Sequence, residues 1–422
     1  MTLSTASASR PPRACRLCEA TALEIVHHFG DQPVAGYLEA SADAARQAAR
    51  FPNAIAVCGR CGLVQQAYDD AIPQLVERVY AHYQPTYSMS PTVREYMRSF
   101  LDLAESRNGV PSEGYVLEIG SNDGAVLAEL KRRGRRPIGL DPSADPEAAA
   151  EHGYEVVRDY FDERSAQRLR DRFGGADLVI SRHTLEHVFE PRSFMRGLAT
   201  LLAAGGTAVI EVPYLRLQLM NNQYQSMTFQ HVCFFTVSTM RALAESEGLT
   251  VVDVTFSSMD GGSIVAFIGR ERAARGSAAS DEVIRFERAC SLDSPATLRT
   301  FFDEWETQRA TVARYLSGHH GRVVAYGAGS KGQALLNMLD VRRDDVPFVI
   351  DDTPGTAGQF IPGMSAEVVA LQDERLSDVA LLFITAPTHI PEVVRRAHTR
   401  FDRALPILAT APAVHLVAPE VA

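Results

Sequence analysis

The sequence predicts an α/β protein in which a small cysteine-rich segment precedes two Rossmann-like domains. Three observations support this prediction. Four of the six cysteines form two C-x-x-C pairs, strands and helices alternate from Tyr115 onward, and two glycine-rich turns each follow an apolar strand. With 422 residues, of which 46% are hydrophobic, the chain is long enough for two or three domains that each bury a core.

The first part, residues 1–75, is expected to bind a metal after a disordered stretch of about a dozen residues. The pairs CRLC and CGRC supply four thiolates in two knuckles, which is the spacing of tetrahedral zinc, and a reducing cytoplasm disfavours disulfides. Four sulfur ligands leave no coordination position open, so we expect structural zinc. The expected ligands are Cys15, Cys18, Cys58 and Cys61.

The second part, residues 76–270, alternates the strands YVLEIG, RPIGLD, EVVRD, ADLVIS and TAVIEVP with helices, as in a doubly wound sheet. Its turn, LEIGSNDGAVL, opens a helix, and the next strand ends in Asp141, twenty-one residues after Gly120. This layout of strand, E-x-G-x-x-x-G, helix, strand and acid is that of class I S-adenosylmethionine enzymes. The open loop admits an amino-acid tail, and the carboxylate can accept both ribose hydroxyls.

The expected cofactor-binding residues lie on the donor loop or at the ends of the following strands: Glu118, Gly120, Ser121, Asn122, Gly124, Asp141, Asp159 and His183. Asp159 follows the third strand, where it could contact adenine, and His183 lies where the fourth strand meets the crevice. A Rossmann-like turn that binds no methyl donor is the alternative.

Residues 271–320 are expected to join the two Rossmann-like domains. GRERAARGSAASDEV, which begins at Gly269 and continues into this region, is rich in small and charged residues, so we expect it to be a flexible linker. The amphipathic stretch from about Asp281 to Leu316 is expected to be helical.

The last part, residues 321–422, holds the other glycine-rich turn. YGAGSKGQALLN has the G-x-G-x-x-G spacing, and FVIDD places Asp351 twenty-four residues after Gly327, where a ribose-binding carboxylate belongs. Taken alone, the pattern indicates a redox enzyme that uses NAD. Lys331 lies inside the loop, where its ammonium group would face a bound phosphate, although a solvated loop lysine is the alternative.

The bulk properties favour small-molecule partners. A net charge of −10 disfavours nucleic acids and anionic membranes, because either would be repelled on average. No apolar run approaches the roughly 20 residues that span a bilayer, and MTLSTASASRPP has no apolar signal-peptide core. We therefore expect a cytoplasmic protein, and the sequence leaves its oligomeric state open.

Several motifs occur together in the order of a known family. They are CRLCEATALEIVHHFGDQPVAGYLEA, CGRCGLVQQ, LEIGSNDGAVL, EVPYL, DGGSI, and YGAGSKGQALLN with FVIDDTPGTAGQFIPG. Over nearly its whole length the chain resembles the sugar C-methyltransferases that act on keto-deoxysugar nucleotides. The resemblance implies a zinc-binding domain, a central class I S-adenosylmethionine methyltransferase domain, and a C-terminal Rossmann-like domain.

The resemblance also implies that the C-terminal loop helps to hold a nucleotide sugar instead of NAD. A helix start that accepts a dinucleotide pyrophosphate can equally accept the diphosphate of a sugar nucleotide. The expected substrate-binding residues are Tyr326, Gly327, Gly329, Ser330, Lys331, Asn337 and Asp351.

Carbon methylation next to a ketone requires a base beside the substrate. The family carries a Tyr-His-Glu-His run whose last histidine is the base, and the matching stretch here keeps His231 but has Thr228 and Gln230 at the tyrosine and glutamate positions. Because Gln230 cannot offset imidazolium charge, we expect a weaker base. The family's Trp-Asn-Tyr segment is replaced by ITAPTHIPE, which puts the acceptor in question. The expected catalytic residues are His231, His187, Tyr83, Tyr87 and Gln230.

The sequence therefore predicts carbon methylation of a nucleotide-linked deoxysugar with S-adenosylmethionine. O-methylation of a sugar or natural-product hydroxyl is one alternative, because a hydroxyl needs only a modest base. A binding protein that has kept the fold without catalysis is another, and a redox enzyme is the last. For His231 itself, the alternative is a buried histidine whose hydrogen bonds are satisfied by the backbone.

Overall fold

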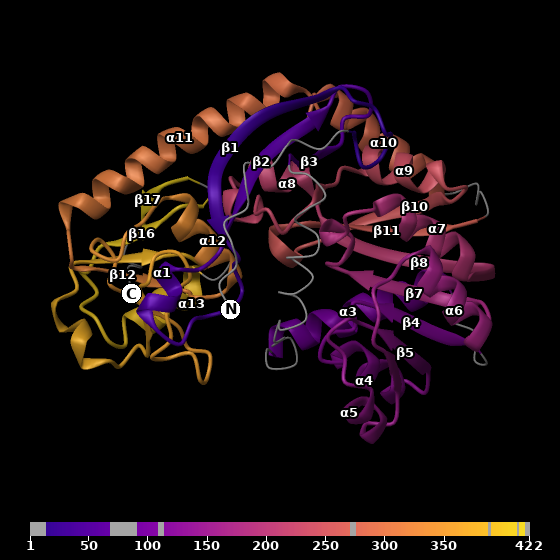
Figure 1. Cartoon of the computed structure of the whole chain (residues 1–422), viewed down its shortest axis with the longest axis horizontal. Helices are drawn as coiled ribbons and strands as arrows, with labels where there is room; N and C mark the ends of the chain where they lie inside the picture. Colours follow the sequence, from indigo (N-terminus) through magenta and orange to yellow (C-terminus); the bar gives the residue numbers. More distant parts are fainter. Residues whose placement is uncertain are drawn as a thin grey trace.

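The computed structural model describes residues 14–67, 91–108, 114–270, 276–386, 390–411 and 413–417. Figure 1 shows two α/β lobes that are joined by the long strands of the N-terminal segment and by a long helix. The expected catalytic residues Tyr83 and Tyr87 lie outside the described residues.

The N-terminal segment forms an antiparallel sheet that is completed by the central part of the chain. Its own elements are β1 (Leu23–Pro33), α1 (Ala42–Arg46), β2 (Arg50–Cys58) and β3 (Val64–Gln66). The fourth strand is β9 (Cys233–Phe234), which pairs with β3. Cys15 and Cys58 are consequently buried in the same apolar core as Leu185 and Phe235 of the central lobe.

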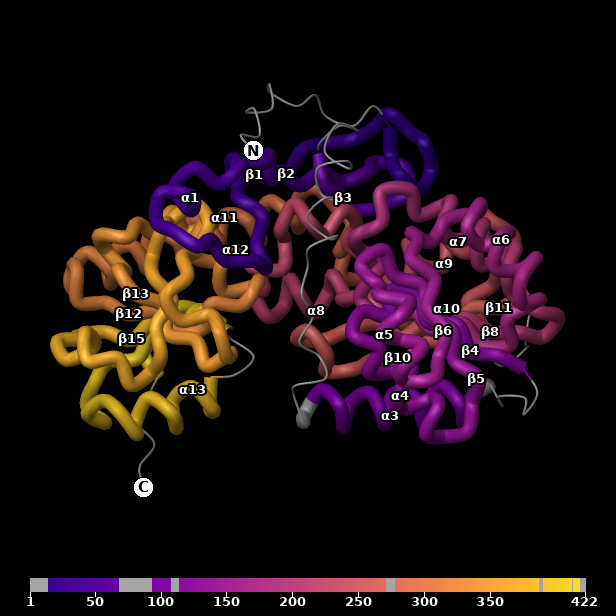
Figure 2. The backbone as a smooth tube through the Cα atoms, turned by 60° about the horizontal axis from the view of Figure 1, so that its bottom comes forward, coloured from indigo at the N-terminus to yellow at the C-terminus, as the bar shows by residue number. Residues whose placement is uncertain are grey.

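The N-terminal segment also reaches the C-terminal lobe, as Figure 2 shows from another side. The amide of Gly36 donates to Gln333 Oε1 at 3.1 Å, and the amide of Gly363 donates to the carbonyl of Ala45 at 2.8 Å. The segment therefore contacts both lobes.

The central lobe is built on a seven-stranded sheet of order β10-β11-β8-β7-β4-β5-β6. The strands are β4 (Tyr115–Ile119), β5 (Arg136–Leu140), β6 (Glu155–Val157), β7 (Ala176–Arg182), β8 (Leu202–Pro213), β10 (Thr250–Ser257) and β11 (Ser263–Gly269). β4 to β8 run parallel, which confirms the doubly wound pattern. The order reverses at β4, and ligands bind beyond the carboxyl end of a strand at such a switch point.

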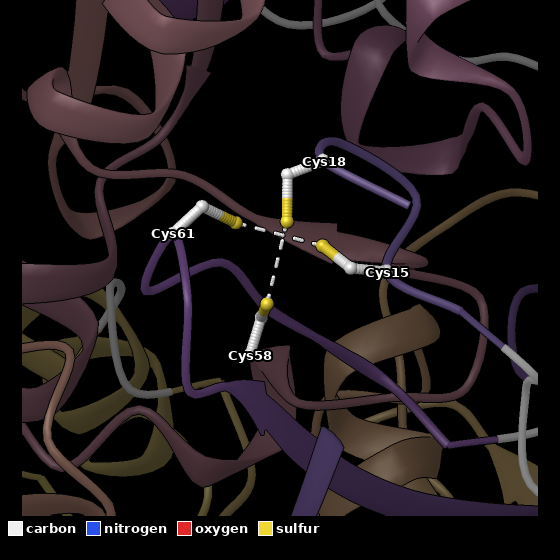
Figure 3. A group of neighbouring side chains, drawn as sticks. All are labelled: Cys15, Cys18, Cys58 and Cys61. Carbon is white, nitrogen blue, oxygen red and sulfur yellow. Dashed lines mark hydrogen bonds between the residues drawn. The ribbon is translucent and has the colours of Figure 1, made fainter. Parts of the chain in front are cut away.

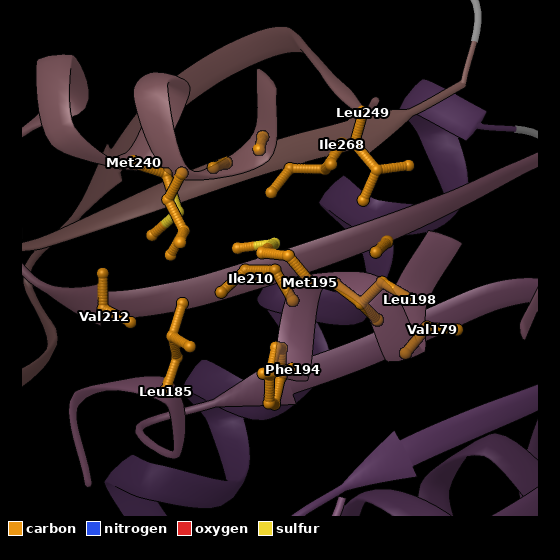
Figure 4. Packing of buried hydrophobic residues seen from close by; sticks show 14 of the residues in the cluster. Val179, Leu185, Phe194, Met195, Leu198, Ile210, Val212, Met240, Leu249 and Ile268 are labelled. Atoms are coloured by element: carbon orange, nitrogen blue, oxygen red, sulfur yellow. The ribbon is translucent and has the colours of Figure 1, made fainter. Parts of the chain in front are cut away.

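Helices cover both faces of this sheet. They are α3 (Pro91–Asn108), α4 (Ala125–Arg132), α5 (Pro146–Glu151), α6 (Glu163–Phe173), α7 (Pro191–Leu201), α8 (Leu215–Met220) and α9 (Val237–Ser246), with the short turns η2 (Leu185–His187), η3 (Tyr224–Ser226) and η4 (Met259–Gly261). In α7, Phe194 and Leu198 recur at helical spacing, and Figure 4 shows them packed with Val179 of β7 and Ile210 of β8.

The joining region is helical over most of its length. α10 (Gly276–Ala289) begins inside the stretch that we expected to be a flexible linker, so that expectation is wrong from Gly276 onward. The chain then breaks before α11 (Pro295–Gly318), because Ser294 caps this second helix and Pro295 occupies its first turn. The face of α11 that carries Phe302 stacks this ring on His27 of β1 at 4.4 Å.

The C-terminal lobe has a six-stranded sheet of order β14-β13-β12-β15-β16-β17. Its elements are β12 (Val323–Tyr326), α12 (Ser330–Met338), β13 (Phe348–Ile350), β14 (Glu367–Val369), η5 (Glu374–Asp378), β15 (Leu381–Ile384), α13 (Ile390–Ala397), β16 (Ile407–Ala409) and β17 (His415–Leu416). The first five strands in this order are parallel, which confirms the second Rossmann-like domain. Among the helices of the described residues, none has the length and apolar character needed to cross a bilayer.

Candidate active site and zinc site

Four cysteine side chains converge from the two knuckles, as Figure 3 shows. Cys15 Sγ lies 3.5 Å from Cys61 Sγ, and Cys18 Sγ lies 3.5 Å from Cys58 Sγ. A tetrahedron with zinc–sulfur bonds of about 2.3 Å has sulfur atoms roughly 3.8 Å apart, so the set matches zinc in ligand type and in spacing.

Backbone amides orient two of these sulfur atoms. The amide of Leu17 donates to Cys15 Sγ and the amide of Arg60 donates to Cys58 Sγ, each at 3.4 Å. Such donors stabilise thiolates and fix their direction toward a metal. All four positions are taken by protein ligands, which fits a structural ion.

A cavity of about 430 Å³ lies at the carboxyl end of β4, where the central sheet reverses its order. The donor loop after β4 and the ends of β5 and β7 line one side of it. The C-terminal lobe contributes Ser330 and Lys331, and the N-terminal segment contributes Ala35. Residues from all three parts of the chain therefore surround one space.

The backbone of the donor loop favours glycine at two positions. Gly120 has φ +76°, and a Cβ there would come within 2.3 Å of Thr184 Oγ1; Gly124 has φ +75°, and its Cβ would come within 2.4 Å of the Tyr154 hydroxyl. The loop thus packs tightly against its surroundings while its backbone faces the cavity.

Asp141 ties the donor loop to the end of β5. Its Oδ2 accepts from the amide of Asn122 at 2.9 Å, and its Oδ1 accepts from the amide and the hydroxyl of Ser143 at 2.8 and 2.6 Å. The carboxylate is almost fully buried and lines the cavity. It is therefore already fixed in the place where a ribose-binding carboxylate is needed.

Three buried polar atoms around this loop have no hydrogen-bond partner among the described residues. Glu118 Oε2, Ser121 Oγ and Asn122 Oδ1 are buried without a hydrogen bond among the described residues, and all three side chains line the cavity. Burial raises the pKa of Glu118 well above its usual range, and nearby Asp141 adds to the rise. Unpaired buried polar atoms are costly, so this wall fits a polar ligand such as the amino-acid tail and ribose of S-adenosylmethionine.

Two histidines form an edge-to-face pair at the other side of the cavity. The rings of His187 and His231 lie 4.9 Å apart at 81°, and His187 Nδ1 hydrogen-bonds to the carbonyl of Gln230 at 2.8 Å. Enclosure in the cavity wall lowers the pKa of His231 well below 6.5; His187 lowers it further, while the charge of Asp260 opposes the shift. His231 is therefore neutral at physiological pH.

A charge network connects the two lobes beside this pair. Lys331 Nζ donates to Asp260 Oδ1 at 2.8 Å, and His183 Nδ1 lies 3.3 Å from Asp260 Oδ2. Burial alone would lower the pKa of His183, but Asp260, Glu186 and Glu211 together raise it to about 9. His183 is thus an imidazolium at neutral pH, and Lys331 brings a second cation to the cavity wall.

Glu211 is the buried carboxylate of the charge network around His183. It is fully buried; its Oε2 accepts from Arg182 Nε at 2.9 Å, and its Oε1 accepts from Ser257 Oγ at 2.6 Å and from the Tyr96 hydroxyl. Although burial opposes ionisation, His183 and Arg182 lower the pKa of Glu211. This carboxylate therefore stays charged and holds His183 in place.

The chain matches three family models in sequence. Residues 15–69 match a zinc binding domain, residues 86–254 match a methyltransferase domain, and residues 258–406 match a C-methyltransferase C-terminal domain. C-methyltransferase NovU of Streptomyces niveus is 32% identical over 361 residues, which cover 84% of each chain.

The chain belongs to this C-methyltransferase family. It is an S-adenosylmethionine-dependent methyltransferase with a zinc-binding domain, which confirms the resemblance, the fold class, the enzyme class and both cofactors predicted from the sequence.

More distant relatives match shorter parts of the chain. A ubiquinone biosynthesis O-methyltransferase of Aeromonas salmonicida is 28% identical over 171 residues, which cover 37% of this chain and 71% of that protein. The crystal structure of an S-adenosylmethionine-dependent methyltransferase of Anabaena variabilis is 16% identical, with a TM-score of 0.37. It covers 48% of this chain and 94% of that one.

The predicted site residues of this C-methyltransferase are dispersed more widely than the sequence suggests. Seven of the eight cofactor-binding predictions line the cavity, all except Gly124, and so do His187, Gln230 and His231. Of the seven substrate-binding predictions, Ser330 and Lys331 line it. Asn337 lines a separate cavity of about 320 Å³ near the other end of α12.

Two further predictions take part in local hydrogen bonds of the C-terminal lobe. The Tyr326 hydroxyl donates to Asp352 Oδ2 at 2.6 Å, and the amide of Ala328 donates to Asp351 Oδ2 at 2.7 Å. Their assignment to substrate stays a prediction.

Several polar residues of the cavity were not predicted from the sequence, among them Arg182, Thr184, Glu186 and Asp260. Asp260 lies inside the motif DGGSI, and Glu186 lies three residues after the predicted residue His183. Glu186, His187 and His231 bring three ligand atoms within 4.8 Å of one another, so they could also hold a divalent ion.

Proposed function

We propose that this methyltransferase adds its methyl group to a carbon next to a ketone on a nucleotide-linked deoxysugar, with His231 as the general base. The observation that carries the proposal is that His231 and the donor loop line the same cavity, where burial lowers the pKa of His231 and keeps its imidazole neutral. A neutral imidazole can accept the α-proton while the methyl donor lies in the same enclosed space.

The reaction that we propose needs a general base, a methyl donor and positive charge near the enolate oxygen. His231 takes the proton from the carbon next to the ketone, the electron pair of that C–H bond forms the enolate, and the enolate carbon attacks the methyl group. S-Adenosylmethionine supplies this methyl group as a sulfonium and leaves as S-adenosylhomocysteine. Negative charge develops on the enolate oxygen, and the cations His183 and Lys331 lie in the cavity wall where they can stabilise it.

The nucleotide-sugar assignment rests on the C-terminal lobe and on the family. Lys331 reaches the cavity from the first turn of α12, where backbone N–H groups and an ammonium group both favour a diphosphate. We propose that residues 76–270 carry the donor and that residues 321–422 hold the nucleotide. Residues 271–320 join these two domains, and residues 1–75 form the zinc-binding domain. We also propose that the protein acts in the cytoplasm.

Isotope exchange tests the base directly. With S-adenosylhomocysteine in the donor site, the wild-type protein should exchange the α-hydrogen of a nucleotide-linked keto-deoxysugar with D₂O, and His231→Ala should not. Turnover of His231→Ala should fall by roughly 10²–10⁴ while its affinity for S-adenosylmethionine stays nearly unchanged, as expected for loss of a general base. His320→Ala removes an exposed histidine of the C-terminal lobe and serves as the control. Full turnover of His231→Ala would eliminate His231 as the base.

One observation favours O-methylation as the second candidate. Position 230 carries a neutral amide whose Oε1 accepts from the amide of Ala35 at 3.1 Å, so this position supplies no carboxylate that would strengthen His231. A hydroxyl group needs less help from a base than a C–H bond does. Turnover without exchange, together with a methyl group located on oxygen by mass spectrometry, would establish this alternative.

A further inference from the structure

The segment that carries His231 is held by the N-terminal sheet. Asn53 Nδ2 donates to the carbonyl of Met227 at 3.0 Å, and Gln66 Nε2 donates to the carbonyl of Thr228 at 2.8 Å. After His231 the chain enters β9, which pairs with β3. Both sides of His231 are therefore fixed by strands that belong to the zinc-binding segment.

Gln66 contributes to both of these attachments. Its side chain is fully buried, and Nε2 donates to Asn53 Oδ1 at 3.0 Å as well as to Thr228. Its backbone amide donates to the carbonyl of Val232 at 2.9 Å. One residue thus hydrogen-bonds the chain three residues before His231 and one residue after it.

The opposite side of the segment is attached to the methyltransferase domain. The amide of Val232 donates to the carbonyl of Glu186 at 2.7 Å, and His187 Nδ1 contacts the carbonyl of Gln230 at 2.8 Å. The short segment around His231 therefore lies between β3 and η2. Small shifts of β3 would move the imidazole relative to the donor loop, and a base must lie within hydrogen-bond reach of its proton.

The zinc ligands fix the hairpin that presents Gln66. Cys58 ends β2, and Cys61 lies three residues before β3. Gly62 follows Cys61 in the connection between these strands and has φ +74°. The amide of Cys58 donates to the carbonyl of Leu63 at 3.0 Å. The knuckle and the strand that contacts the His231 segment therefore form one continuous unit.

We propose that Gln66 is a positioning residue for His231, and that the zinc knuckle acts through Gln66 on the geometry of the active site. This inference rests on the proposed role of His231 as the base. It gives the zinc-binding segment a part in catalysis that does not require the metal to touch the substrate.

Gln65 supplies a matched control for Gln66. It lies on the same strand and is equally buried, but its Oε1 accepts from the amide of Arg16 at 3.0 Å in the first knuckle. Gln65→Met and Gln66→Met each replace a buried amide by an apolar side chain of similar length. Comparable changes in thermal stability are expected, whereas the effects on catalysis should differ.

Steady-state kinetics with S-adenosylmethionine and a nucleotide-linked keto-deoxysugar provide the first measurement. Gln66→Met should lower kcat by about 10-fold or more while KM for S-adenosylmethionine stays within twofold, because misplacing a base costs rate and not donor affinity. Gln65→Met should keep kcat within twofold. Equal losses of kcat in the two variants would show that Gln66 is merely structural and would overturn the proposal.

Nitrogen-15 NMR of labelled histidine gives a second measurement that does not depend on turnover. The His231 signal, assigned by its loss in His231→Ala, should shift in position and in pKa in Gln66→Met and not in Gln65→Met. An unchanged His231 signal in Gln66→Met would also overturn the proposal. If Gln66→Met does not fold, Asn53→Ala removes the acceptor of Gln66 and the donor to Met227, and it should alter kcat and the signal in the same direction.

The two hypotheses fail separately in these experiments. Full turnover of His231→Ala would remove the base assignment, whatever Gln66 does. Loss of turnover in His231→Ala, together with identical behaviour of the two glutamine variants, would keep the base and remove the positioning role.

Discussion

Asp141 and Asp351 occupy equivalent places in the two Rossmann-like sheets. Each follows the second strand of its sheet and accepts a hydrogen bond from the glycine-rich loop after the first strand, from the amide of Asn122 at 2.9 Å or of Ala328 at 2.7 Å. Each also accepts from the amide two residues further on, in Ser143 or Thr353. Asp141 lines the large cavity together with buried polar atoms that have no partner, and Asp351 is not among its lining residues.

This relationship predicts different results for the same substitution. Asp141→Ala should weaken S-adenosylmethionine binding by about 1–3 kcal/mol through loss of charge-assisted hydrogen bonds to the donor. Asp351→Ala removes the same contact from the other loop and should leave that affinity unchanged. Calorimetry measures both. Saturable NAD binding that Gly329→Val abolishes would instead assign a dinucleotide to the C-terminal loop.

Metal analysis should find one zinc per chain, and Cys58→Ser should lose it. The four thiolates are placed for a tetrahedral ion, and part of the free energy of zinc binding is folding free energy of the segment. The variant should therefore unfold at a lower temperature than the wild-type protein.

The same metal analysis tests the base. A second tightly bound metal ion per chain that disappears in Glu186→Gln would place a metal on His231 and would contradict its role as a free base.

The chain contains two lysines, which provide a matched pair for testing the acceptor site. Lys331→Ala should raise KM for the nucleotide sugar by about 10-fold, because it removes a cation from the cavity wall near the start of α12. Lys131→Ala removes a lysine that donates to the carbonyl of His152 in the central lobe and should leave this KM unchanged. An equal KM in both variants would show that the acceptor carries no anion near Lys331.

Local sequence patterns predicted the two Rossmann-like sheets and the zinc-binding domain in which four cysteines come together. The donor loop is recognisable because its glycines satisfy a local steric demand: φ is positive at Gly120 and Gly124, and neighbours leave no room for a Cβ. Likewise, the C-x-x-C spacing is a local consequence of metal geometry. Such features depend on a few consecutive residues and therefore appear in one sequence.

Other parts of the site depend on contacts between distant segments. Pairing of β9 with β3 joins residues about 170 positions apart, as the numbers of Cys233 and Gln65 show. Nor does a motif reveal that Asp260 contacts Lys331, since this pair crosses between two lobes. The linker prediction failed from Gly276 onward because packing of α10 stabilises a helix where small and charged residues suggested a loop, with Ile284 buried in the central core.

The pH dependence of kcat/KM should report His231 and His183 in the free enzyme. The pKa of His231 is lowered, so its neutral, proton-accepting form persists to acid pH, and activity should fall only as pH drops through that value, well below 6.5. The pKa of His183 is raised to about 9, so its cation is fully present below pH 6.5 and is lost as pH rises through about 9. The profile should therefore be bell-shaped, and the stability that the ion pairs of His183 provide should decline on the same alkaline side.

His183→Gln removes this cation and should abolish the alkaline limb. It should also shift the acid limb to higher pH, because His183 is one of the charges that lower the pKa of His231. An acid limb at pH 6.5 or above in the wild-type protein would contradict a neutral His231 in an enclosed wall. An alkaline limb that persists in His183→Gln would assign that ionisation to another group.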